Sequence, residues 1–237
     1  MTTYWLSLQL LSDTTFGRGD GVAGEVDAEV QHDDYGLPYL GGKTLKALLT
    51  ATCAEILYAL ELAHIADLPR WQASAQRLFG GPGSVSNRVG LMHVGDAQLP
   101  SDLRAAIAQD VIAERRRPGG PRFTSADVLA SLTTVRRQTA LDATGAPMQE
   151  TLRSMRVIIR DTTFVSRLDF AANPDDLDLA LLAACVSAFR RAGTGRNRGR
   201  GQLVAELYDQ EPGQTGPVTS AYLARFRREV GAREGEA

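Results

Sequence analysis

A nine-residue segment in the last quarter of the chain, Gly193 to Gly201, combines four glycines with three arginines. It follows an apolar helical pattern and precedes a strand pattern over Gln202–Tyr208, so it connects a helix to a strand. Glycine adopts positive φ and lets a ligand approach the backbone closely, and arginine presents a planar, permanently charged fork that suits phosphate. The segment is typical of a phosphate-binding loop for a polyanion, or of a glycine-rich turn with solvated charges.

The hydrophobic periodicity elsewhere indicates an α+β chain. Alternation over Tyr4–Leu10 and over Glu25–Val30 predicts half-buried strands, and apolar residues at helical spacing over Lys43–His64 predict one long helix. The remaining patterns predict helix Trp71–Phe79, strand Val89–Leu99, helices Ser101–Arg117 and Thr124–Leu132, strands Met155–Ile159 and Thr163–Phe170, an amphipathic helix Asp176–Ala192 capped by Asp175, and a last helix Val218–Val230.

The order of these elements matches a ferredoxin-like βαββαβ core with insertions. The strands on either side of Arg160-Asp161 are expected to pair with each other, and Val135–Gln149 is expected to be irregular. We expect residues 1–210 to form one domain, and residues 211–237 to form a linker and a short helix. A four-stranded sheet of this type is a platform for single-stranded RNA, although a fold alone does not define a function.

The charge of the chain is small overall but unevenly distributed. A formal net charge of -2 excludes a chain that is basic throughout, so any nucleic-acid site must be a local patch. The charged residues form clusters of either sign, basic at 115–117, 136–137, 153–160 and 190–200, and acidic at 20–34 and 175–178.

Two cysteines, Cys53 and Cys185, lie in apolar helical patterns. This placement favours small buried hydrophobic residues over a disulfide or a zinc site. The chain shows no signal-like basic and apolar start, and no apolar run of the roughly 18 residues that a membrane span needs. We therefore expect a cytoplasmic protein that does not bind a membrane.

The start of the long helix is a candidate anion site. Gly41-Gly42 lies just before its first turn, where backbone N–H groups are free and the helix dipole is positive. Lys43 and Lys46 add side-chain charge at the same end. The alternative is that both lysines lie on the solvated face of an amphipathic helix.

Several segments, taken in order, resemble the RAMP superfamily of CRISPR-associated proteins, and specifically the backbone subunits of type III effector complexes. The resemblance covers roughly nine-tenths of the chain, and its short motifs gain weight from their shared order. The matching segments are Leu6–Leu11 with the loop Phe16–Gly19, Val26–Val30 with Gly36–Lys46, Arg77–Gly80 with Gly95–Ala97, Val135–Ala146 with Thr163–Phe170, and the helix that leads into Gly193–Gly201.

The resemblance implies an RRM-like core with a thumb-like insertion at about residues 100–160. It also implies a subunit that stacks with other copies of itself and with other CRISPR effector subunits along a guide RNA (crRNA), which pairs with a target RNA in a ribonucleoprotein. The guide-contacting residues that it implies are Lys43, Lys46, Arg136, Arg137, Gly193, Gly195, Arg196, Arg198, Gly199, Arg200 and Gly201.

The resemblance further implies that Asp27 is the catalytic aspartate of members that cleave the target RNA with a divalent metal, Mg or Mn. A carboxylate can hold a hydrated cation or assist proton transfer when a 2′-OH attacks the phosphate. The alternation places Asp27 on the polar side of its strand, and His32, Asp20 and Asp33 are nearby alternatives. Glu29 is expected to add negative charge beside the site.

The sequence departs from the family pattern at Ala28 and Glu29, where the family commonly has a small polar residue and proline. Three alternatives therefore stay open. The chain could be a backbone subunit without cleavage. It could be a guide-RNA-processing endonuclease, which would need a His, Lys and Tyr constellation that His32, His64 and His93 do not supply. It could also be an unrelated ferredoxin-like enzyme or small-molecule binder with no affinity for RNA.

Overall fold

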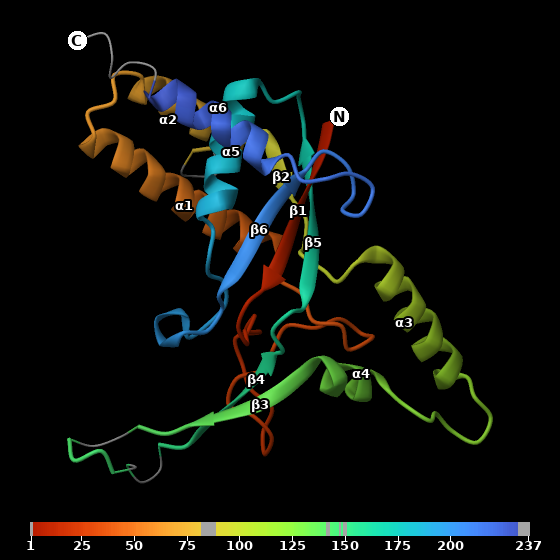
Figure 1. Cartoon of the computed structure of the whole chain (residues 1–237). Helices are drawn as coiled ribbons and strands as arrows, with labels where there is room; N and C mark the ends of the chain where they lie inside the picture. Colours follow the sequence, from red (N-terminus) through yellow and green to blue (C-terminus); the bar gives the residue numbers. More distant parts are fainter. Residues whose placement is uncertain (1, 82–88, 141–142, 147, 149–150, 232–237) are drawn as a thin grey trace.

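The computed structural model describes residues 2–81, 89–140, 143–146, 148 and 151–231. It is a mixed α/β chain with two antiparallel sheets (Figure 1). The elements in chain order are β1 (Thr2–Leu10), α1 (Gly42–Leu62), α2 (Leu68–Phe79), β2 (Met92–Val94), α3 (Ser101–Arg115), α4 (Ser125–Leu132), β3 (Thr133–Gln138), β4 (Arg153–Ile158), β5 (Thr163–Phe170), α5 (Asp176–Ala188), the 3-10 helix η2 (Arg196–Arg198), β6 (Leu203–Tyr208) and α6 (Thr219–Gly231). Among these helices, none is long and apolar enough to cross a bilayer.

The main sheet has four strands in the order β2-β5-β1-β6. All neighbouring strands are antiparallel, and Leu6 of the central strand β1 lies opposite Ser166 of β5 and Leu207 of β6. When α2, η2 and the segment between β2 and β5 are set aside, the elements from β1 to β6 follow the order β1, α1, β2, β5, α5, β6. This arrangement is compatible with an RRM-like fold.

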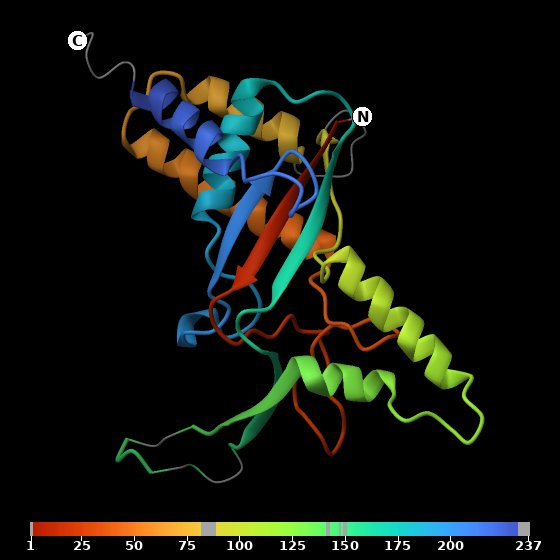
Figure 2. The same ribbon diagram turned by 45° about the vertical axis from the view of Figure 1, so that its right-hand side comes forward.

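The core lies between this sheet and a layer of helices on one side of it (Figure 2). Tyr4, Leu6, Leu8 and Leu10 of β1 are buried, as the alternation predicts. Helix α5 differs from its prediction, since every residue of 177–186 is buried and the helix is therefore not amphipathic. It packs against α1, α2 and α6 as well as against β6, which leaves it no solvated face.

The hairpin formed by β3 and β4 is a second, separate sheet, which projects from the end of the molecule opposite α6 (Figures 1 and 2). Two predictions are wrong here. The segment from Val135 begins in a strand rather than an irregular region, and β4 pairs with β3 rather than with β5. The reason is that both edges of β5 are already occupied, by β1 and by β2. Residues 141, 142, 147, 149 and 150 of the expected irregular region lie outside the described residues.

The segment from Glu25 to Val30 does not form a regular strand. Its contacts are isolated bridges, including a parallel bridge from Ala28 to Met155 on the outer edge of β4. The Asp27 N–H donates to the Ser154 carbonyl at 2.9 Å, and the Arg156 N–H donates to the Ala28 carbonyl at 3.0 Å. The expected burial of Val26 and exposure of Asp27 are confirmed. The short pairing fixes Asp27 beside Ser154, near the end of the β3–β4 ladder that leads into the hairpin loop.

Candidate nucleic-acid interface

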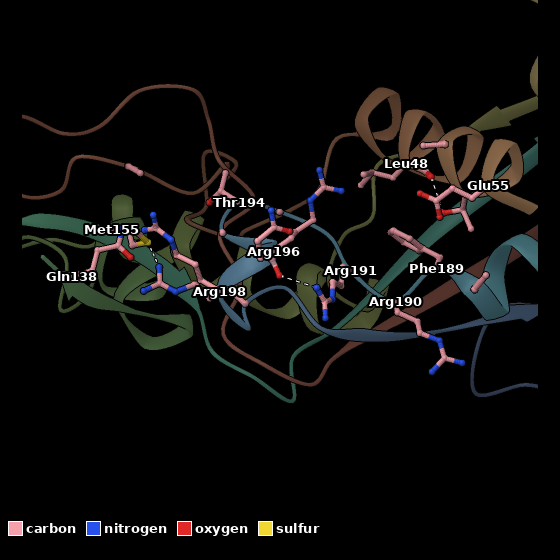
Figure 3. A pocket seen from close by; sticks show the side chains of 18 residues that line it. Leu48, Glu55, Gln138, Met155, Phe189, Arg190, Arg191, Thr194, Arg196 and Arg198 are labelled. Atoms are coloured by element: carbon pink, nitrogen blue, oxygen red, sulfur yellow. Dashed lines mark hydrogen bonds between the residues drawn. The ribbon is translucent and has the colours of Figure 1, made fainter. Parts of the chain in front are cut away.

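A groove of about 970 Å³ lies between α1, the hairpin and the segment that joins α5 to β6 (Figure 3). The wall from α1 carries Leu48 and Glu55, and the hairpin contributes Gln138 and Met155. The opposite wall consists of residues from the α5–β6 segment, namely Phe189, Arg190, Arg191, Gly193, Thr194, Gly195, Arg196, Asn197, Arg198 and Arg200.

The glycines of this wall are needed for its backbone path. Gly193, Gly195, Gly199 and Gly201 all have positive φ, and η2 lies between Gly195 and Gly199. A Cβ on Gly193 would lie 2.5 Å from the Thr15 carbonyl oxygen, so only glycine fits there without a shift. The Thr194 N–H donates to the same Thr15 carbonyl at 3.0 Å, which ties this loop to the segment after β1. The expected left-handed conformations are confirmed.

The arginines of the wall, all exposed except the half-buried Arg200, have no acidic partner in the part of the chain that the structure describes. Within the described residues, no ion pair involves Arg190, Arg196, Arg198 or Arg200, and the first three project from an exposed surface. Arg200 donates instead to the Met155 sulfur, so it is held against the hairpin. Sequence reasoning omitted Arg190 and Arg191 from the site, although both directly precede the loop in a basic run. The groove wall therefore concentrates positive charge that the protein does not neutralise.

The two predicted hairpin arginines differ in their surroundings. Arg136 donates to Asp13 Oδ2 through Nε at 2.9 Å and through Nη2 at 2.7 Å. Arg137 is exposed and follows Arg136 on β3, and successive side chains of a strand point to opposite faces. The two arginines therefore do not converge on one side of the hairpin.

The start of α1 already holds a carboxylate of the protein. Asp96 Oδ1 accepts a hydrogen bond from the Gly42 N–H at 2.7 Å. Lys46 donates from Nζ to the Met92 carbonyl at 2.8 Å, and burial lowers the pKa of its ammonium. Lys43 is exposed. Of the residues predicted at this helix start, Lys43 alone keeps its side chain in solvent.

Asp27 lies on a neighbouring cavity of about 600 Å³ that it shares with Arg198, Gln138 and Met155. Its Oδ2 accepts from the Ser154 N–H at 2.7 Å and from the Ser154 hydroxyl at 3.2 Å. The backbone hydrogen bond from Ser154 lowers the pKa of this carboxyl, against an opposing effect of desolvation. Asp27 is therefore ionised at neutral pH, and the charge of Arg153 also lowers its pKa.

The nearby alternatives to Asp27 are engaged in their own turns. Asp20 pairs with Arg18 at 2.7 Å, and Asp33 accepts from the Tyr35 and Leu37 N–H groups at 2.9 and 3.0 Å. The His32 ring nitrogen Nδ1 lies 3.1 Å from the Asp33 carbonyl oxygen. These contacts stabilise local loop structure.

Glu29 contradicts the expectation that it adds charge beside the site. Its side chain is 2% exposed, and both its carboxylate oxygens accept from Arg156 Nε, at 2.9 and 3.1 Å. The Val30 N–H also donates to Glu29 Oε1 at 2.8 Å. The charge of Glu29 is thus neutralised inside the protein, and Asp27 is the carboxylate of this segment that faces the cavity.

A divalent cation would find few protein ligands here. The described residues contain no group of three or more metal-binding side chains. Asp27 offers one oxygen, Oδ1, for which no hydrogen bond is seen among the described residues. Mg²⁺ commonly binds through one or two carboxylates together with substrate phosphates and waters, so Asp27 could hold such a cation only if a bound phosphate supplied further ligands.

Comparison with known proteins supports the fold. No protein-family model and no curated protein matches the sequence. A chain of the type III-B Cmr-beta complex bound to cognate target RNA matches with a TM-score of 0.58 at 13% identity, over 87% of this chain and 97% of that one. The apo state of Cmr-beta gives 0.57 at 13% identity over the same shares, and a type IV-B CRISPR complex gives 0.54 at 13% identity, over 90% and 92%. The protein therefore shares the fold of subunits of CRISPR effector complexes.

Proposed function

We propose that the protein is a RAMP-type backbone subunit of a CRISPR effector complex, of the type III class, and that it binds guide RNA in the groove. The observation that carries this proposal is the groove wall, where Arg190, Arg196 and Arg198 are exposed without carboxylate partners in the described structure. The likeness of the fold to CRISPR complex subunits supports it. In this proposal, β1, β2, β5 and β6 with α1 and α5 are a ferredoxin-like core, and the β3–β4 hairpin is the thumb.

The chemistry of the groove suits a phosphate backbone better than a base edge. Guanidinium groups and the N–H groups of a glycine-rich loop bind phosphate oxygens, which position an RNA without reading its sequence. A subunit that repeats along a guide needs such binding, because base pairing between guide and target supplies the specificity. Other copies of the chain, other effector subunits and the target RNA in the cytoplasm are the partners that this function requires.

Salt-dependent binding of a single-stranded RNA by the full chain tests the proposal. Each phosphate contact that is lost lowers the slope of log K against log salt by roughly 0.7 for single strands, so the double variant Arg196→Gln and Arg198→Gln should lower it by about 1.4. The matched control is Arg227→Gln and Arg228→Gln, which removes the same charge from exposed positions on α6. Equal slopes for the two double variants would contradict RNA binding in the groove.

We further propose that Asp27 takes part in cleavage of the target RNA. Internal attack of a 2′-OH on the adjacent phosphate forms a 2′,3′-cyclic phosphate and breaks the bond from phosphorus to the 5′-oxygen. The step requires removal of the hydroxyl proton, stabilisation of charge on the phosphate and a proton from solvent for the leaving 5′-oxygen. Asp27 Oδ1 would accept that proton or orient the hydroxyl, and Arg198 on the same cavity would stabilise the phosphate. In the alternative, the same oxygen would hold a divalent metal, Mg or Mn, together with the RNA phosphates, and the cation would neutralise charge on the phosphate.

A second candidate function is an RNA-binding subunit that does not cleave. The observation that favours it is the engagement of Asp27 Oδ2 by Ser154, which lowers the pKa of the carboxyl and makes it a weak base. Target-RNA cleavage by the assembled complex, compared between wild type and Asp27→Asn with Mg²⁺ and with chelator, separates the two. If the wild-type complex cuts the target at regular positions, and these cuts disappear both in Asp27→Asn and in chelator, Asp27 takes part in catalysis. If the target stays intact on the wild-type complex, the second function is supported.

A further inference from the structure

A second basic cavity, of about 490 Å³, lies at the base of the hairpin. Four segments that are distant in sequence meet there: the residues after β1, strand β3, the turn between β4 and β5, and the end of the glycine–arginine loop. The residues that line it are Leu11, Ser12, Asp13, Arg136, Arg160, Gly199 and Arg200. Arg200 also lines the groove, so this one side chain lies between the two cavities.

The charge in this cavity is unbalanced. Arg136, Arg160 and Arg200 bring three guanidinium groups, and Asp13 brings the one carboxylate among the lining residues. Arg160 is 74% exposed, and its only ion pair among the described residues is a contact at 4.0 Å with the equally exposed Asp161. An exposed pair of this kind contributes little, so the Arg160 guanidinium is available to a ligand.

The contacts of Asp13 show which donors of the cavity hold an anionic group. Its Oδ2 accepts from Nε and Nη2 of Arg136, and its Oδ1 accepts from the Arg160 N–H at 3.3 Å. A guanidinium edge and a backbone N–H are the donors that phosphate oxygens also take. A structural ion pair would need Arg136 alone, whereas the cavity adds two more arginines around it.

The backbone leaves room for a ligand at this point. Gly199 lines the cavity with φ of 76°, and a Cβ built on it would meet no atom within 4 Å. The glycine therefore borders open space rather than a neighbouring segment. A phosphate could approach the loop backbone here without displacing other residues.

We propose that this cavity is a second phosphate site, which takes a phosphodiester of the RNA that passes the glycine–arginine loop. Asp13 holds the Arg136 fork in the absence of RNA, and Arg160 and Arg200 contact the phosphate directly. The site rests on the proposed function, because the rest of the RNA would lie in the groove on the other side of Arg200. It adds Arg160 to the RNA-binding residues. Asp13 positions the Arg136 guanidinium, and its negative charge repels the bound phosphate.

RNA binding by the full chain tests this site through Arg160→Gln, a variant of an exposed side chain that leaves the fold intact. Its salt slope should fall by roughly 0.7 to 1 relative to wild type. Arg228→Gln on α6 is the matched control and should keep the wild-type slope. Asp13→Asn keeps the shape of the side chain but removes a negative charge beside the phosphate, and should tighten RNA binding by roughly fivefold.

The outcomes separate the site from the proposed function. If Arg160→Gln keeps the wild-type slope while Arg196→Gln lowers it, RNA binds in the groove and the second site is wrong. If Asp13→Asn weakens binding, Asp13 does not oppose a bound anion, which also overturns the proposal. If wild-type protein binds RNA without salt dependence, the proposed function itself fails. Binding of inorganic phosphate to the wild-type protein that is lost in Arg160→Gln, with an unchanged RNA slope, would overturn RNA as the ligand in favour of a small phosphate compound.

Discussion

The glycines of the loop wall make a stability prediction that separates two structural roles. Gly201 has φ of 72°, and a Cβ on it would lie closer than 3.0 Å to the Ala192 carbonyl oxygen. The left-handed conformation alone costs an alanine roughly 1–2 kcal/mol. Relief of the clash would also disturb the hydrogen bond from the Ala192 N–H to the Gly201 carbonyl, at 2.9 Å, and the bridge between Arg191 and Gln202.

We therefore expect Gly201→Ala to lower the free energy of unfolding by about 3 kcal/mol, since two lost hydrogen bonds add about 1 kcal/mol each. Gly199→Ala is the matched control, because it has φ of 76° but meets no atom within 4 Å, and should cost only about 1 kcal/mol. Urea unfolding of the two variants and wild type measures both values. Equal losses for the two variants would refute the view that Gly201 is needed for close packing against Ala192.

Three further predictions concern the charges around the site. Arg156→Met should lower the free energy of unfolding by about 3–5 kcal/mol, because it leaves the buried Glu29 carboxylate without its partner. In urea unfolding, the double variant with Glu29→Leu should recover most of this loss, and no recovery would contradict the buried pair. The backbone N–H and the hydroxyl of Ser154 both lower the pKa of Asp27, the N–H more strongly, so these contacts contribute stability above about pH 4 that is lost as the pH falls through the lowered pKa. Ser154→Ala removes the hydroxyl alone, so acid titration by NMR should show the Asp27 pKa raised only part of the way toward its ordinary value, and a pKa identical to that of wild type would contradict the hydroxyl contact. Lys46→Met should weaken stability by about 1 kcal/mol through the lost bond to the Met92 carbonyl, and a thermal melt identical to wild type would speak against that bond.

Local patterns in the sequence were sufficient for most elements of the core. Alternation over Tyr4–Leu10 and helical spacing over Lys43–His64 report a single buried face, and both elements form with nearly the expected bounds. The Asp175 side chain caps α5 as predicted, accepting from the Asp178 N–H at 2.8 Å. The glycine loop was also predictable, because positive φ limits the residues that can occupy such positions.

The contacts that shape the candidate site could not be read from local patterns. Asp13 and Arg136 meet across 123 positions of sequence, and Glu29 and Arg156 across 127. Neither pair produces a periodic pattern in the sequence. A single charged residue is expected to be solvated unless its partner is known, and the sequence does not indicate which distant residue that partner is. The pairing of β4 with β3 failed for a similar reason, because adjacency in sequence favoured β5, whose edges other strands occupy.

The central claim is that RNA lies in the groove between α1, the hairpin and the glycine–arginine loop. Photo-cross-linking of 4-thiouridine-containing RNA to the full chain, followed by mapping of the modified peptides, tests it most directly. We predict cross-links in residues 190–200 and in the hairpin around Gln138 and Met155, and their loss in high salt. Cross-links confined to α2 and α6, with none in the loop, would contradict RNA binding in this groove.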